Sequence, residues 1–211
     1  MWDLHHYFEA DSLSIDLQFD ISFFKGLDIP YSLSSYRAPK YNNKVPTMAI
    51  NILSKSTWRA NVGEHVDYCK LIQIPIYIVF PANYVTTSIY RPPFLRAYIL
   101  QPSGEYKIHD IRDVTLHEGK EKGEDIERNE EAIIDLSPIL PFRLGLEKLK
   151  KKHEGKLELY RVVIIKPDEF EVFPTLTEQE RERAEKEKTR AEQAEQKISE
   201  LEAKLKQLES N

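Results

Sequence analysis

The sequence has few of the residues on which several kinds of functional site depend. Among its 211 residues Cys69 is the single cysteine, and seven residues are glycine. One cysteine excludes an intrachain disulfide and the paired cysteines of a zinc finger. The glycines form no phosphate-binding loop, no dinucleotide-binding fingerprint and no nucleophile elbow. The sequence therefore gives no support for the nucleotide-binding and hydrolase functions that depend on those motifs.

A long apolar run is also absent. The most apolar stretch, LIQIPIYIVF from Leu71 to Phe80, is about half the length that a bilayer requires, and it contains Gln73 and Pro75. The first residues, MWDLHHYFEA, have neither the basic region nor the apolar region of a signal peptide. We therefore expect a cytoplasmic protein with no membrane partner.

The chain has no excess of positive charge, since its formal net charge is −5. His117–Glu131 has seven acids and three bases, and residues 178–211 have ten acids and eight bases, so the rest of the chain is near +1. Binding to DNA would need a local basic patch. The candidates are Arg37, Lys40, Lys44, Lys55 and Arg59. Ordinary solvated surface is the alternative explanation for these residues.

The apolar pattern predicts a sheet with a helix against it. Apolar and polar residues alternate from Ser12 to Phe23, as in a half-buried strand. Met48–Leu53 and Ile74–Phe80 are almost wholly apolar, which is typical of strands covered on both faces. Arg59–Ile72 is expected to be a helix, and its buried stripe consists of Val62, Val66, Cys69 and Ile72. We expect the three strands to be neighbours in one sheet, with the helix packed across them.

The remaining elements complete the predicted fold class. Further strands are expected at Val85–Tyr90, Arg96–Leu100, Tyr106–Ile111, Ile133–Leu136 and Leu157–Ile165. This order predicts an α/β or α+β domain with a mixed sheet over residues 1–174. From Thr177 the sequence lacks glycine and proline, and Thr177 with Glu180 fits a capping box. Residues 175–211 are therefore predicted to form one long helix.

The predicted helix also has a heptad pattern. Positions a hold Ala184, Ala191, Ile198 and Leu205, and positions d hold Ala194, Leu201 and Leu208. Isoleucine at a and leucine at d favour a parallel two-stranded coiled coil, here over Ile198–Leu208. The expected partner is a second copy of this chain or a paralogue. The alternative is a single solvated helix stabilised by its own Glu–Lys pairs.

Three segments and the charged helical tail resemble the Uma-two family. The segments are FDISFF (Phe19–Phe24), PTMAINILSKST (Pro46–Thr57) and DYCKLIQIPIYIVF (Asp67–Phe80). That family consists of restriction-endonuclease-like proteins of the PD-(D/E)XK nuclease superfamily. The resemblance implies a restriction-endonuclease-like mixed sheet with a flanking helix. It also implies hydrolysis of phosphodiesters, in which two carboxylates hold Mg²⁺ and a lysine assists the attacking water.

The resemblance assigns catalytic positions to Asp20, Asn51 and His65. Asp20 matches the first acid of the family pattern, although Phe19 stands where the family has proline. Asn51 stands where the second acid, a glutamate, is expected. His65 lies near the position of the lysine. Asp20 and Asn51 would be the metal ligands, with Mg²⁺ as the cofactor if the protein is an active enzyme.

Ser54 matches the serine of the family pattern, and Lys55 and Arg59 belong to the candidate basic patch. We expect these three residues to bind the DNA substrate. Two of the three catalytic positions are altered, however. An amide brings no charge to a hard dication, and a histidine has no permanent positive charge. We therefore favour a catalytically impaired nuclease-fold protein that acts by binding DNA or another protein.

Two other functions stay open. One is an active Mg²⁺-dependent endonuclease in which Asp16 or Glu64 replaces the missing acid. The other is an assembly or scaffold protein whose working part is the C-terminal coiled coil. The individual residues also have structural explanations. Asp20 fits a solvated strand residue, Asn51 a hydrogen-bonded core amide, His65 a helix-surface residue, and Ser54–Thr57 a helix N-cap.

Overall fold

The computed structural model describes residues 4–10, 12–29, 33–81, 87, 89–117, 127–149 and 158–209, and it describes side chains as far as residue 198. The chain divides into two compact units, Met1–Glu171 and Val172–Asn211. The fold is mixed α+β. In its described part, the first unit has three β-sheets and short helices, and the second unit has one long helix.

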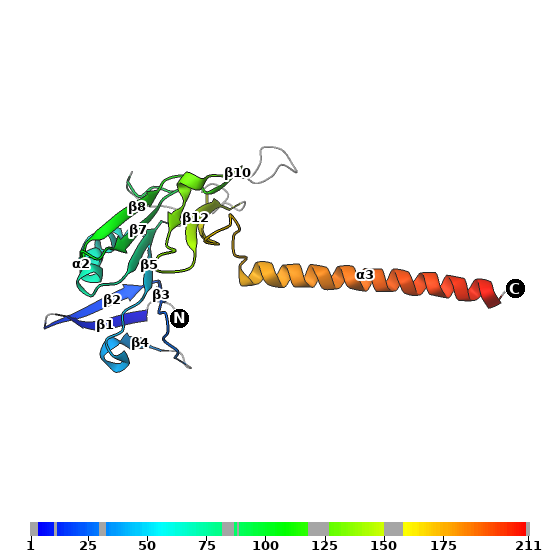
Figure 1. The fold of residues 1–211 in the computed structure, drawn as a ribbon, viewed down its shortest axis with the longest axis horizontal. Helices are drawn as coiled ribbons and strands as arrows, with labels where there is room; N and C mark the ends of the chain where they lie inside the picture. Colours follow the sequence, from blue (N-terminus) through cyan, green and yellow to red (C-terminus); the bar gives the residue numbers. More distant parts are fainter. Residues whose placement is uncertain are drawn as a thin grey trace. The chain divides into compact units, whose positions relative to one another are not determined.

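The central sheet carries the candidate site (Figure 1). Its strands, in spatial order, are β3 (Ile21–Phe23), β5 (Met48–Ile52), β6 (Ile76–Phe80), β7 (Leu95–Leu100) and β8 (Tyr106–Ile111). β5 and β6 are parallel, and the other neighbours are antiparallel. Every residue of β6 is buried, as expected for an apolar strand that is covered on both faces. The strands predicted from Met48, Ile74, Arg96 and Tyr106 are confirmed.

Two short helices, α1 (Trp58–Val62) and α2 (Glu64–Leu71), cover one face of this sheet. Cys69 and Ile72 are buried there against Tyr77 and Val79, and Val62 and Val66 are half-buried in the same cluster. The predicted packing is confirmed, but the continuous helix over Arg59–Ile72 is wrong. The break is at Gly63, whose φ of −119° and ψ of −102° lie outside the helical region.

A second sheet consists of β1 (Leu4–Ala10), β2 (Leu13–Phe19) and β4 (Ser35–Arg37), in the order β2-β1-β4, and the 3₁₀ helix η1 (Ala38–Tyr41) follows β4. β2 is antiparallel to β1, and β4 is parallel to it. Its core is aromatic. His6, Phe8, Phe19, Phe24 and Tyr36 pack with ring centroids 4.6–6.3 Å apart.

The predicted single strand over Ser12–Phe23 is wrong, because the chain bends at Asp20 and passes from one sheet to another. Before the bend, β2 buries Ile15, Leu17 and Phe19 as predicted, whereas Leu13 at its start is exposed. After it, Ile21 and Phe23 are 50% and 43% exposed. Ser22 takes the inward position, where its Oγ hydrogen-bonds to Nε2 of His6 over 2.9 Å. The bend reverses the face on which the alternating residues lie.

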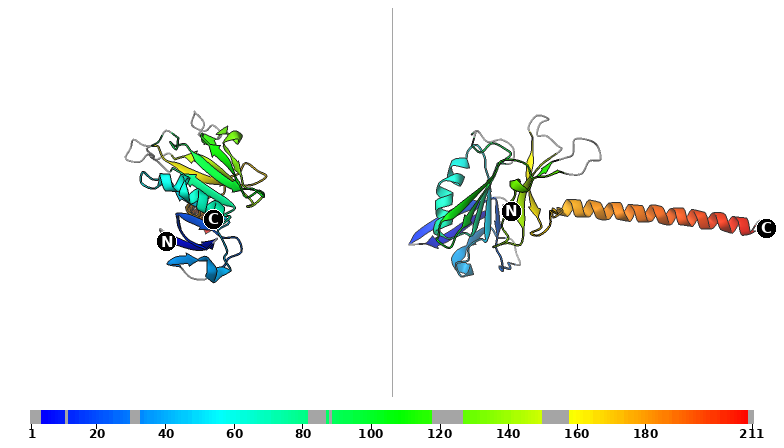
Figure 2. Two further views of the ribbon diagram at one scale, coloured as in Figure 1. Left: turned by 90° about the vertical axis from the view of Figure 1, so that its left-hand side faces the viewer. Right: turned by 45° about the horizontal axis from the view of Figure 1, so that its top comes forward.

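A third sheet covers the other face of the central sheet, opposite α2 (Figure 2). It contains β9 (Leu116–His117), β10 (Glu127–Arg128), β11 (Ile134–Asp135), β12 (Arg143–Lys148) and β13 (Tyr160–Ile165), and the 3₁₀ helix η2 (Glu130–Ala132) lies between β10 and β11. β11 and β13 fall within the strands predicted at Ile133–Leu136 and Leu157–Ile165. Of the strand predicted at Val85–Tyr90, residues 85, 86 and 88 lie outside the described residues. The described residues Thr87, Ile89 and Tyr90 form a bend and a turn, so the prediction is wrong there.

The second unit contains α3 (Leu176–Glu209), which confirms the predicted long helix. Its capping box is not the predicted pair of Thr177 and Glu180. The backbone N–H of Thr175 donates to Oε2 of Glu178 over 2.7 Å, and the N–H of Glu178 donates back to Oγ1 of Thr175 over 3.3 Å. The helix therefore begins directly after Thr175.

Candidate functional site

Asn51 lies on β5 and is 2% exposed. Its Nδ2 lies 3.1 Å from the hydroxyl of Tyr77 on β6, 3.2 Å from Oδ1 of Asn61 on α1, and 3.2 Å from Nδ1 of His65 on α2. The Tyr77 hydroxyl also donates to the backbone carbonyl of Asn61 over 2.9 Å. One buried amide thus ties two strands of the sheet to both helices that cover it.

The other end of the Asn51 amide faces the bend between β2 and β3. Its Oδ1 accepts the backbone N–H of Asp20 over 3.2 Å. Turning the amide over would place its NH₂ group against that N–H and its oxygen against Oδ1 of Asn61, so the contacts fix one orientation. The side-chain oxygen that would bind a metal therefore already accepts one backbone N–H, and the amide hydrogens point into the network.

Asp20 is exposed and lies at the bend itself. Its Oδ2 accepts the backbone N–H of Ile52 over 2.6 Å. β3 begins only at Ile21. At the bend, the Asp20 carboxylate therefore accepts a β5 backbone N–H, as backbone carbonyls do within the β3–β5 pair. Asp20 and Asn51 are thus brought together as predicted, but each one binds a backbone N–H of the neighbouring segment.

His65 is half-buried on α2. Its Nδ1 accepts from Asn51, which leaves the ring proton on Nε2. Burial lowers the pKa of His65 below its ordinary value of 6.5, and the nearby Glu64 opposes this only in part. The ring is neutral at pH 7, so it supplies no positive charge where the resemblance expects a lysine.

The predicted DNA-contacting residues lie at the entry to α1. Oγ of Ser54 accepts the backbone N–H of Thr57 over 3.2 Å and hydrogen-bonds to Oγ1 of Thr57 over 2.7 Å, so Ser54 shapes the turn. Lys55 and Arg59 are exposed. The Arg59 guanidinium lies 5.2 Å from the ring centre of Trp58. Both cations are therefore exposed where the chain enters α1.

The donor set does not fit a hard divalent cation. Mg²⁺ requires several oxygen ligands in near-octahedral geometry, whereas the Asn51 oxygen and one oxygen of Asp20 accept backbone N–H groups. Asp16, a proposed replacement, is hydrogen-bonded to His5 over 2.9 Å. Among the residues that the structure describes, no group of three or more His, Cys, Asp or Glu side chains is placed to hold a metal.

Two members of the network, Asn61 and Tyr77, were missed by sequence reasoning. Burial raises the pKa of Tyr77 well above its ordinary value of 10, so its hydroxyl stays protonated and can donate. A signal for both was present. Asn61 precedes His65 by four residues, which is one helical turn, and Tyr77 places a hydroxyl in an otherwise apolar strand.

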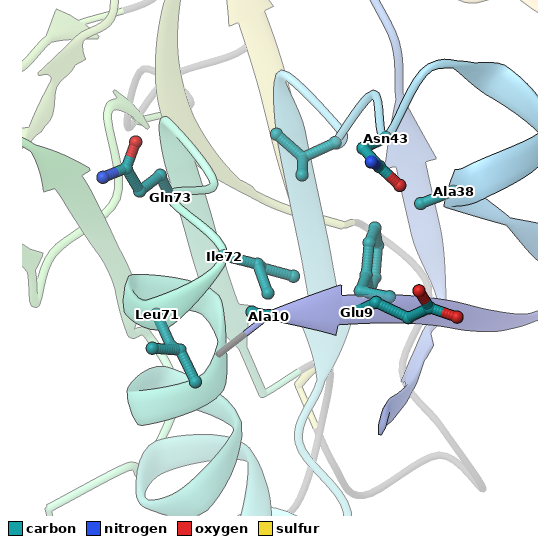
Figure 3. A pocket seen from close by; sticks show the side chains of 9 residues that line it. Glu9, Ala10, Ala38, Asn43, Leu71, Ile72 and Gln73 are labelled. Atoms are coloured by element: carbon teal, nitrogen blue, oxygen red, sulfur yellow. The ribbon is translucent and has the colours of Figure 1, made fainter. Parts of the chain in front are cut away.

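A pocket of about 230 Å³ lies elsewhere in the first unit, between the ends of β1 and α2 (Figure 3). Its lining residues are Phe8, Glu9, Ala10, Ala38, Asn43, Val45, Leu71, Ile72 and Gln73. In Figure 3, Ala10 and Ile72 lie on one side and Ala38 and Asn43 on the other. None of the predicted catalytic residues lines this pocket.

Comparison with known proteins found no relative, since no family model, no curated protein and no solved structure matches the chain. Over the described residues, no helix is long and apolar enough to cross a membrane.

Proposed function

We propose that this chain is a nuclease-fold protein that acts by binding rather than by hydrolysis. The resemblance of Phe19–Phe24 and Pro46–Phe80 to the Uma-two family supports the nuclease origin of the fold. The observation that carries the loss of activity is the orientation of Asn51. Its oxygen accepts the N–H of Asp20, and its NH₂ group faces Asn61, His65 and Tyr77. At the positions that the resemblance assigns to catalysis, the carboxylate of Asp20 is present, but the second acid and the lysine are replaced by Asn51 and His65.

DNA is the partner to test first. Lys55 and Arg59 are both exposed at the start of α1. Side chains of this kind bind phosphates whatever the base sequence, and each phosphate contact adds to the salt dependence of affinity. Any binding through this surface would be weak and salt-sensitive, because the chain as a whole carries a net charge of −5.

Cleavage and binding are tested separately. Plasmid DNA incubated with the purified full chain and millimolar Mg²⁺ or Mn²⁺ should stay intact. A labelled duplex should bind without metal, and Lys55→Ala and Arg59→Ala should each lower the salt slope by about 1. Lys107→Ala, which removes an exposed lysine on β8, is the matched control and should change nothing. Metal-dependent cutting that Asp20→Ala abolishes would overturn the proposal in favour of an active endonuclease.

A second candidate function is assembly through the C-terminal helix. α3 extends from Leu176 to Glu209, and over its described side chains Leu176 and Ile198 are 77% and 56% exposed. A helix of this length without a buried face gains little stability from packing. A coiled coil formed by α3 would cover the apolar seam. Deletion of residues 176–211 would then abolish association and leave the first unit folded.

A further inference from the structure

The second unit presents one helix face whose partner can be argued from charge. Between residues 176 and 198, every side chain of α3 is exposed or half-buried. The intrahelical pair of Glu182 and Lys186 joins positions f and c of the heptad, on the outer face. A second pair, Lys188 and Glu192, joins positions e and b over 3.9 Å. Among the described side chains, neither pair uses the apolar a and d seam.

The charges beside the seam are sorted by position. The g positions hold Arg183, Arg190, Lys197 and Lys204, which are all basic. The last three e positions hold Glu195, Glu202 and Glu209, which are all acidic. In a parallel pair each g residue lies near the e residue five positions later on the partner, whereas an antiparallel pair brings g near g and e near e.

We propose that α3 binds a second copy of this chain, in register and parallel, through Ile198–Leu208. In that arrangement Arg190 faces Glu195, Lys197 faces Glu202, and Lys204 faces Glu209, each pair being of opposite charge. These pairs occur on both sides of the seam. An antiparallel arrangement would set lysines against lysines and glutamates against glutamates, so the charge pattern selects one orientation.

A second copy is the occupant because the pattern is self-complementary. A helix with basic g and acidic e positions offers its own copy the opposite charge at every contact of the strong seam. Upstream the match fails, since Arg183 would face Lys188 and Glu187 occupies a d position. Pairing is therefore confined to the last heptads. This inference specifies the partner in the assembly function proposed above and does not depend on the nuclease resemblance.

Sedimentation equilibrium of the full chain at tens of micromolar tests the association. The wild-type protein should be a dimer, and Leu201→Glu, at a d position, should weaken the dimer at least tenfold. Ala203→Glu adds the same charge at the outer f position and should leave the dimer unchanged. Circular dichroism confirms that both variants keep α3 helical. A monomeric wild-type chain, or equal effects of the two variants, would overturn the proposal.

Disulfide trapping tests the orientation. In a parallel pair Ala194→Cys, at a d position, brings the two new thiols together, whereas in an antiparallel pair centred on Ile198–Leu208 they lie about 27 Å apart. In a glutathione redox buffer, the trapped dimer should form at least tenfold more readily than in the Leu201→Glu background. Cys69 is fully buried and stays silent. A dimer that does not trap is antiparallel and contradicts the proposal. Cleavage of DNA by the protein would overturn the proposed binding function but would not change the expected results of these two association experiments.

Discussion

The backbone N–H of Asp20 donates to Oδ1 of Asn51 over 3.2 Å, and this contact decides which end of the Asn51 amide faces the protein interior. Two residues that the sequence pairs as metal ligands are thus paired as structural groups. The carboxylate of Asp20 binds Ile52 N–H, and the NH₂ group of Asn51 binds the residues that join the helices to the sheet. The constellation holds the bend, β5 and the two helices together.

Removal of the Asn51 side chain should destabilise the first unit. Asn51→Ala leaves Asp20 N–H without its acceptor and removes the donor that faces Asn61 and Tyr77. Buried polar groups that lose their partner cost about 1–3 kcal/mol, and we expect a loss of about 2–3 kcal/mol in urea unfolding. Gln193→Ala, which truncates an exposed amide on α3, should change stability by less than about 0.5 kcal/mol. Equal effects of the two substitutions would contradict the buried network.

The stability of the first unit should fall in mild acid because of His6. The side chain is fully buried among aromatic rings, and burial lowers its pKa from 6.5 to about 4. The unfolded chain therefore binds a proton more readily between these values. The contribution of the neutral His6 ring to the free energy of unfolding is complete above pH 6.5, and it is lost as the pH falls towards 4. Between pH 7 and pH 4.5 the loss should be about 2–3 kcal/mol.

Urea unfolding of His6→Phe at the same two pH values isolates this effect from that of the carboxylates. Phenylalanine fits the aromatic surroundings and does not titrate, so the variant should lose less stability than the wild-type protein on acidification. His109→Gln is the comparison. Burial and the nearby Lys107 also lower the pKa of His109, but it is only half-buried on β8, so its replacement should reduce the acid sensitivity less than His6→Phe does. The same acid sensitivity in His6→Phe and the wild-type chain would show that His6 does not carry the effect.

Gly145 on β12 should not tolerate a side chain. A Cβ there would lie 2.4 Å from Oγ1 of Thr115, whose hydroxyl donates to Ala132 O over 2.5 Å and accepts Leu146 N–H over 2.7 Å. Gly145→Ala must displace these buried bonds and should cost about 2–3 kcal/mol by overpacking. Thr115→Ser keeps the hydroxyl and should cost less. A Gly145→Ala protein as stable as the wild type would show that the third sheet can shift freely.

The apolar pattern predicted most strands of the central sheet, and β8 has the predicted bounds. It failed at Asp20, because Ile21 and Phe23 continue the alternation of β2 although the chain has changed sheets. The backbone N–H of Asp20 donates to Asn51, which lies far away in the sequence. The alternation of apolar and polar residues around Asp20 cannot indicate this contact. The break at Gly63 did have a signal, since an isolated glycine in a helical pattern lowers its stability.

The N-terminus of α3 shows a different limit. In the sequence TLTEQE, Thr175 with Glu178 and Thr177 with Glu180 both fit a capping box, so spacing alone does not separate them. At the candidate site, the resemblance to the Uma-two family predicted that Asp20, Asn51 and His65 lie together, and Asn51 does contact both of the others. It could not show the direction of the Asn51 amide, which depends on Asn61 and Tyr77.

The central claim is that Asp20 and Asn51 belong to a structural hydrogen-bond network and do not form a metal centre. Thermal unfolding of the wild-type chain and of Asn51→Asp, each with and without millimolar Mg²⁺ or Mn²⁺, tests it most directly. If the protein has a cation site, a cation concentration a hundred times the dissociation constant of that site would stabilise the folded protein by about 2.7 kcal/mol. We predict no rise in Tm with metal for the wild-type chain, and a destabilised Asn51→Asp variant that metal does not restore. A metal-dependent rise in Tm that Asp20→Ala abolishes would contradict the account.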